Sequence, residues 1–220
     1  MVQSVSIDNA PVFKTWHIYI ALVVVNMLLI YADSQLVMTR DVYYNILSDQ
    51  MEYSRIDQVY EAVKGYSIWG YLFVPLILWL RIAFVVLMTQ FPFILRDIDI
   101  PFKQVFRAGC FGLLFLAVGS MLRIIYLSSL PSDQVDKTIL TFVPFSIAQF
   151  LDAEAYGTTA FAVLSSFNIF ELLWILMISK GVASSGKVNK GDAILVTSFI
   201  WVIILVFQWG LGISLEKING

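Results

Sequence analysis

Residues 17–32 read HIYIALVVVNMLLIYA, sixteen positions without a single Asp, Glu, Lys or Arg. With its neighbours, this apolar stretch runs from about Trp16 to Val37. The hydrocarbon core of a bilayer is about 30 Å thick, and a helix needs about 20 apolar residues to cross it. The stretch is therefore long enough to span a membrane as one helix. An open strand would leave backbone groups unpaired in lipid.

The whole chain has the composition of a membrane protein. Its 220 residues are 59% hydrophobic and 14% charged, against about 45–50% and 25% in soluble domains, and the mean hydropathy is +0.81. A soluble fold of this length cannot bury so much apolar surface, because a small domain leaves a large fraction of its surface in water. The excess must face lipid. The net charge of −2 provides no basic face for nucleic acid.

Five stretches of the chain have the length and composition of transmembrane helices. They cover residues 16–37, 66–90, 105–127, 156–179 and 193–215. The predicted fold class is an all-α integral membrane protein with five transmembrane helices in a single polytopic domain, residues 1–220. Because five is odd, we expect the two ends of the chain on opposite sides of the bilayer.

The positive charges favour one orientation. With the N-terminus inside, seven basic residues fall on the inner side and five on the outer side; the inner seven are Lys14, Arg96, Lys103, Arg107, Lys180, Lys187 and Lys190. Inner loops carry an excess of Lys and Arg, so we expect a cytoplasmic N-terminus and a periplasmic C-terminus. The short termini favour a bacterial inner membrane, and a eukaryotic organelle remains open.

Two long connections are expected to form amphipathic segments on the outer side. In the first, between Asp33 and Gly65, apolar residues recur at helical spacing and predict a short helix that lies on the membrane face or against the bundle; they are Ile56, Val59, Tyr60 and Val63. In the second, between Pro131 and Ala155, residues 138–151 read TILTFVPFSIAQFL. This run is too short to span, and it predicts an interfacial or partly re-entrant helix.

Three charged residues lie within the predicted spans, where a central charge costs roughly 2.5–3.5 kcal/mol. Arg81 and Glu171 lie nine and eight residues from the inner ends of their spans, so both are about 12–14 Å deep and are predicted to pair. Arg123 lies nearer the outer boundary. With Asn168 these residues form a candidate intramembrane polar site. A structural ion pair that fixes helix packing fits the same pattern.

The chain offers little for catalysis. His17 is the only histidine and Cys110 the only cysteine, and they lie far apart in the sequence, so no metal motif can be built on them. The spans hold no Ser–His or paired-Asp constellation for hydrolysis. We therefore expect no metal, no cofactor and no catalytic residue.

From Pro144 to about residue 208 the chain resembles the Yip family, five-span membrane proteins named for their interaction with Ypt/Rab GTPases, which include bacterial relatives. The similar sequence comprises PFSIAQFLDAEAYGTTAFAVLSSFNIFELLWILMISKGV, residues 144–182, and DAILVTSFIWVIILVF, residues 192–207. Within it, a polar-plus-tryptophan element comprises Asn168, Phe170 and Trp174. The resemblance implies a five-span fold and a role as a small scaffold or transport accessory. The aspartate-leucine-tyrosine-glycine-proline motif of eukaryotic members is absent, so no GTPase partner is implied.

Three functions remain open from the sequence. The first is a non-enzymatic scaffold or accessory subunit of a membrane transport or envelope complex, which would have another membrane protein or a second copy of this chain as its partner. The second is a small transporter or channel with a path lined by Arg81, Arg123 and Glu171. The third is a membrane enzyme acting at the outer face through acids such as Asp49, Glu52 and Asp57.

Overall fold

The computed structural model describes residues 14–48, 50–152 and 155–219, so Asp49 lies outside the described residues. Its α-helices are α1 (Thr15–Ala32), α2 (Arg40–Leu47), α3 (Tyr53–Ile94), α4 (Phe102–Ser128), α5 (Thr158–Ser166), α6 (Ile169–Ala183) and α7 (Lys190–Asn219). A π-helical turn, η1 (Asp33–Val37), extends α1, and three 3₁₀ turns lie between α4 and α5: η2 (Ser132–Gln134), η3 (Ile139–Thr141) and η4 (Ile147–Phe150). The predicted all-α class is confirmed for the described residues.

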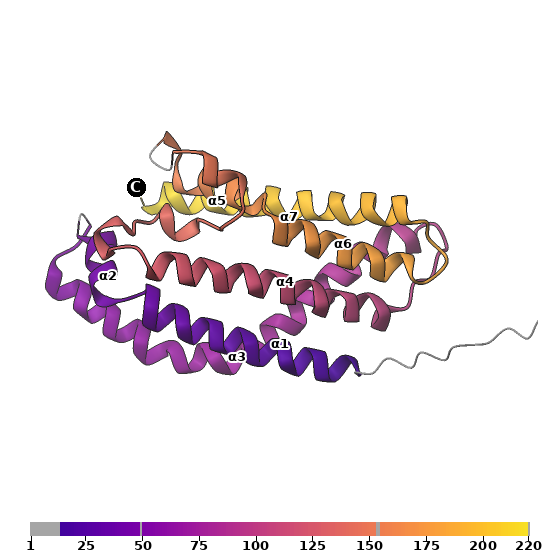
Figure 1. The fold of residues 1–220 in the computed structure, drawn as a ribbon, viewed down its shortest axis with the longest axis horizontal. Helices are drawn as coiled ribbons and strands as arrows, with labels where there is room; N and C mark the ends of the chain where they lie inside the picture. Colours follow the sequence, from indigo (N-terminus) through magenta and orange to yellow (C-terminus); the bar gives the residue numbers. More distant parts are fainter. Residues whose placement is uncertain (1–13, 49, 153–154, 220) are drawn as a thin grey trace, which may run out of the picture.

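Four helices of the described chain are long and apolar enough to cross a membrane. Their apolar parts cover Thr15–Val37, Trp69–Ile94, Phe102–Ser128 and Lys190–Ser214. These segments match four of the five predicted spans. In Figure 1, α1, α4 and α7 follow the long axis of the molecule, and α3 crosses it obliquely. The arrangement is consistent with a multi-pass membrane protein.

Helix α3 is 42 residues long and changes direction along its course (Figure 1). Pro75 lies in its interior, where proline removes a helical hydrogen bond and bends the helix. The Pro75 carbonyl accepts a hydrogen bond from the Tyr19 hydroxyl of α1. The first turns of α3 contain Ile56, which is fully buried. The residues predicted to be helical there are helical and pack against the bundle through Ile56, but they belong to α3 and not to a separate short helix, because Gly65 weakens the helix without ending it.

Helix α6 packs closely along α4 in the centre of the bundle, and two glycines of α4 allow this approach. A Cβ atom on Gly112 would lie 2.9 Å from Cδ1 of Trp174, and one on Gly119 would lie 2.7 Å from Cδ2 of Phe170. Both distances are shorter than a real Cβ atom tolerates. Small residues let helices pack closely where lipid supplies no hydrophobic drive for association. The glycines therefore set the distance between α4 and α6.

The fourth predicted span, residues 156–179, is not one helix. Helix α5 ends at Ser166 and α6 begins at Ile169, so the helical structure is interrupted at Phe167 and Asn168. The prediction of one continuous helix is wrong because it followed apolar composition alone. Asn168 caps α6 and starts a new helix there.

The connection between α4 and α5 also differs from the prediction. Within the described part of residues 131–155, the chain forms short 3₁₀ turns instead of a longer interfacial helix. Pro144 has no backbone N–H to donate, and Phe145 has a φ of 60°, in the left-handed region that ends helices. These two neighbours separate η3 from η4.

The long helices begin and end at two opposite ends of the bundle (Figure 1). We call one the basic end, since α1 begins there and the seven basic residues Lys14, Arg96, Lys103, Arg107, Lys180, Lys187 and Lys190 lie at or near the helix ends that meet there. The other, the α2 end, holds α2, the connection between α4 and α5, and the end of α7. The described chain therefore begins and ends at opposite ends of the bundle.

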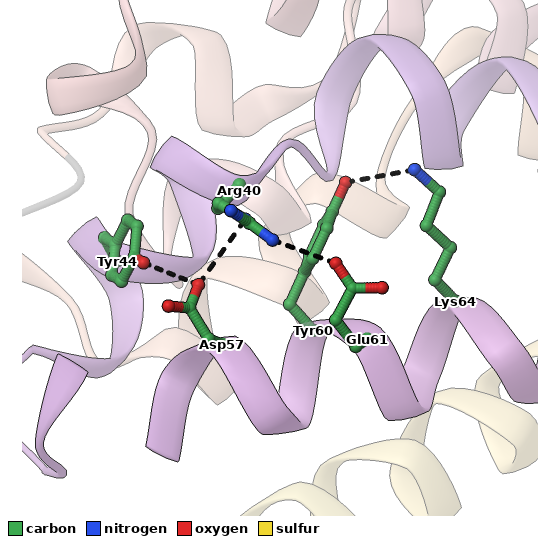
Figure 2. A network of polar contacts seen from close by, with 6 residues as sticks. All are labelled: Arg40, Tyr44, Asp57, Tyr60, Glu61 and Lys64. Carbon is green, nitrogen blue, oxygen red and sulfur yellow. Dashed lines mark hydrogen bonds and ion pairs between the residues drawn. The ribbon is translucent and has the colours of Figure 1, made fainter. Parts of the chain in front are cut away.

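At the α2 end, a polar network joins α2 to the first turns of α3 (Figure 2). The Arg40 guanidinium donates to Oε1 of Glu61 at 2.9 Å, and its Nε lies 3.4 Å from Oδ1 of Asp57. The Tyr44 hydroxyl donates to the same Asp57 oxygen at 2.6 Å, and Arg40 lies 5.4 Å from the centre of the Tyr60 ring. Asp57 and Glu61 raise the pKa of Arg40. These contacts fix α2 on α3 and pair Asp57 and Glu61 with other side chains of the same connection.

Candidate functional site

The break between α5 and α6 is formed by Asn168. Its backbone is extended, and its side-chain oxygen accepts hydrogen bonds from the N–H groups of Phe170 and Glu171, each at 2.9 Å. The side-chain amide donates to the Ser165 carbonyl at 2.9 Å. Asparagine is among the preferred residues at a helix N-cap, because its side chain pairs with N–H groups that the helix leaves free. The local sequence therefore dictates a new helix start at this point.

A second segment crosses the break and pairs with it. Ser146 and Asn168 form an isolated antiparallel bridge, and the Ile147 N–H donates to the Phe167 carbonyl at 3.0 Å. Phe145, with its left-handed backbone, turns the chain into this segment. Backbone groups that a broken helix would leave unpaired are thus satisfied by the chain itself, which is the condition for non-helical backbone at membrane depth.

A groove of about 660 Å³ lies beside the break. The first turns of α6 form one side, the segment around η4 another, and Trp201 of α7 a third. Most of its lining side chains are apolar, including Phe145, Phe150 and Phe167. Ligand sites of this kind combine apolar walls with a few fixed polar groups, and we call this space the Glu171 groove.

Among the described residues that line the Glu171 groove, Glu171 is the only charged one. Its Oε2 accepts a hydrogen bond from the indole N–H of Trp201 at 3.2 Å. Its Oε1 has no hydrogen-bond donor, and no cation lies within 4.0 Å of the carboxyl, among the residues that the structure describes. A carboxylate in apolar surroundings is costly unless it is paired. The free oxygen of Glu171 is therefore the strongest point of attraction for a hydrogen-bond donor or a cation in the groove.

A second polar group at the Glu171 groove also lacks a partner. Ser146 lines the groove and is 3% exposed, and its hydroxyl has no hydrogen-bond partner within the described part of the chain. Buried polar groups are nearly always paired, and each exception calls for an explanation. Among the described residues, Ser146 is therefore a groove-lining residue whose buried hydroxyl is unpaired.

Arg81 does not form the predicted ion pair with Glu171, since no ion pair between described residues joins the two. Arg81 lines a small void with Trp174 and Ile178, which lie about one and two turns beyond Glu171 on α6. Because α3 crosses the bundle obliquely (Figure 1), equal residue counts from the helix ends do not give equal depths. The charge of Arg81 still attracts the Glu171 carboxyl over a longer distance.

Arg123 belongs to a different contact at the α2 end. Its guanidinium donates to Oδ1 of Asp33 at 2.7 Å and to the Leu140 carbonyl at 2.9 Å. Asp33 begins the π-helical turn that extends α1, and Leu140 lies in η3. Arg123 therefore ties α1 and the connection between α4 and α5 to α4. It does not line the Glu171 groove.

Of the four residues of the predicted site, the structure thus brings Asn168 and Glu171 together and leaves Arg81 and Arg123 apart from them. Two groove residues were missed from the sequence, Ser146 and Trp201. Trp201 carried a signal, because it lies mid-span in an apolar run instead of at a predicted membrane interface. Ser146 carried none, since nothing local predicts its pairing with the helix break.

Comparison with known proteins gives no indication of function, so the assignment of function rests on the geometry of the groove. No family model matches this chain, and neither a curated protein nor a solved structure matches it.

Proposed function

We propose that this chain is a small multi-pass membrane transporter that binds an amphipathic cation in the Glu171 groove. The observation that carries the proposal is the Glu171 carboxyl, which has one oxygen free among aromatic walls beside a broken helix. Ionisable residues within spans mark substrate pathways, and transporters form their sites at interrupted helices. A protonated amine would pair with the carboxylate, while an apolar body would contact Phe150 and Phe167.

In this proposal α5 and α6 together make the fourth of five crossings, before α7. Helix α6 has 15 residues, so at 1.5 Å per residue it is only about 22 Å long, short of a bilayer core of about 30 Å. Helix α5, with 9 residues, supplies the rest across the break. The excess of Lys and Arg at the basic end favours that end as the cytoplasmic one. The Glu171 groove then opens in the outer half of the membrane.

The experiment that tests this function measures binding and uptake of ethidium, a fluorescent amphipathic cation. Glu171→Gln keeps the shape of the side chain and an acceptor for Trp201 but removes the charge. A hydrogen bond to a charged group contributes about 1.5–3 kcal/mol, so we expect affinity to fall by at least about tenfold. Glu52→Gln, an exposed acid outside the groove, should leave binding unchanged.

Two results would count against this function. Equal ethidium affinity in the native chain and in Glu171→Gln would remove Glu171 as the binding group. Binding without Glu171-dependent uptake into proteoliposomes would remove the transport step and favour an accessory subunit. The accessory-subunit role, the Yip-type resemblance and the bacterial inner membrane stay predictions, and a stoichiometric partner recovered in mild detergent would support the first of them.

A further inference from the structure

A second and larger groove lies at the basic end, with a volume of about 1040 Å³. Residues of α1, α3, α4 and the end of α6 line it. Its walls include the aromatic side chains Trp16, Trp79, Phe106 and Phe111. Ligand pockets occupy roughly 300–1,000 Å³, so this space is large enough for the head and part of the tail of an amphiphile. We call it the basic groove.

Four cations line the basic groove, and none of the described residues that line it is acidic. Lys14 precedes the first turn of α1, and Lys180 lies in the last turn of α6. Lys103 and Arg107 are four residues apart on α4, so they lie on one face of that helix. Among the described residues none of the four forms an ion pair. Within the described residues no carboxylate neutralises these four charges, and the Arg107 guanidinium lies 5.9 Å from the centre of the Phe111 ring.

Two uncharged polar side chains in the walls of the basic groove, Tyr19 and Gln104, are already paired. The Tyr19 hydroxyl donates to the Pro75 carbonyl, and the Gln104 side chain donates to the Gly181 carbonyl at 3.0 Å and to the Ser184 hydroxyl at 2.5 Å. The groove therefore presents apolar walls and unpaired cations. Its chemical complement is a molecule with an apolar chain and an anionic head.

We propose that the basic groove binds an anionic phospholipid from the surrounding bilayer. Lys103, Arg107 and Lys180 hold the phosphate headgroup, and an acyl chain lies along Trp16 and Phe111. Basic pockets between transmembrane helices bind anionic headgroups in this way, with each cation adding to the attraction. This site is separate from the Glu171 groove, shares no lining residue with it, and does not depend on the proposed transport.

Native mass spectrometry of the full chain in mild detergent tests the proposal with phosphatidylglycerol and phosphatidylcholine as probes. We expect the native chain to retain phosphatidylglycerol in preference to phosphatidylcholine. Each cation removed should weaken phosphatidylglycerol binding about fivefold, so the double variant Lys103→Gln, Arg107→Gln should lose about 25-fold. Lys180→Gln, at an exposed position, should lose about fivefold without disturbing the helix packing.

The matched control is the double variant Arg96→Gln, Lys190→Gln. It removes the same charge from the same end, but neither residue lines the basic groove, so phosphatidylglycerol binding should stay within about twofold of the native value. Equal loss in both double variants would show general attraction to the basic end and overturn the site. Equal retention of the two lipids would also overturn it. So would a dimer that dissociates only when Lys103 and Arg107 are changed, because the occupant would then be a second copy of the chain.

Discussion

Arg123 and Asp33 form an ion pair of 2.7 Å between α4 and the end of α1, with side chains that are 30% and 27% exposed. The other ion pairs between described residues involve Arg40, whose side chain is 48% exposed. Charges removed from water depend on each other, and loss of one partner leaves the other unpaired. Arg123 also donates to the Leu140 carbonyl, so one side chain connects three parts of the chain at the α2 end.

The Asp33→Asn variant should therefore be less stable by about 1–3 kcal/mol, because the Arg123 charge loses its anionic partner. Unfolding in mixed micelles, followed by tryptophan fluorescence, measures the free energy. The double variant Asp33→Leu, Arg123→Met should lose less stability than the sum of the losses in Asp33→Leu and in Arg123→Met, since it leaves no charge unpaired. Additive losses in the double variant would contradict the coupling.

The second prediction concerns Asn168, which caps α6. Asn168→Ala removes the acceptor for the Phe170 and Glu171 N–H groups and should cost about 0.5–2 kcal/mol of stability. Asn168→Ser retains a capping hydroxyl and should lose less. Both variants can be compared by amide hydrogen exchange at residues 169–172. Unchanged protection in Asn168→Ala would mean that the cap does not hold the helix start.

The sequence predicted most of the bundle because apolar length is a property of local composition. The spans at 16–37, 66–90, 105–127 and 193–215 needed only the count of apolar residues, and the structure has helices over all four. The fourth span failed for a specific reason. The Asn168 side chain alone caps the start of a new helix. The average composition of a segment does not change noticeably with one capping residue, so it could not predict this break.

The candidate site was predicted less well, because it depends on contacts between distant segments. Glu171 was recognised as a costly charge within a span, yet its partner is Trp201, thirty residues later. Arg123 pairs with Asp33, ninety residues earlier. Counting residues from the helix ends gives the depth of a residue only when the helices are straight and parallel. It cannot find partners when α3 changes direction and crosses the bundle obliquely (Figure 1).

The third prediction tests the close packing of α4 and α6. Gly119→Ala places a Cβ atom 2.7 Å from the ring of Phe170, so the helices must separate, and overpacking of this kind costs about 1–3 kcal/mol. Gly70→Ala is the control, because a Cβ atom there meets nothing within 4 Å; that variant should be neutral or slightly more stable. Thermal unfolding in detergent compares them. Adding Phe170→Leu to Gly119→Ala should recover part of the loss, and no recovery would place the strain elsewhere.

The fourth prediction concerns the pH range over which α2 stays on α3. The hydrogen bond to Asp57 raises the pKa of Tyr44 above its ordinary value of 10.0, since it stabilises the neutral phenol. Its contribution to stability is therefore complete below about pH 10, where the unfolded phenol ionises, and is lost as the pH rises through the higher folded pKa. Absorbance at 295 nm reports the ionised phenol. We expect Tyr44→Phe to remove a titration step above pH 10, and Asp57→Asn to move that step toward pH 10. If the step that Tyr44→Phe removes lies at pH 10 in the native chain, the hydrogen bond is contradicted.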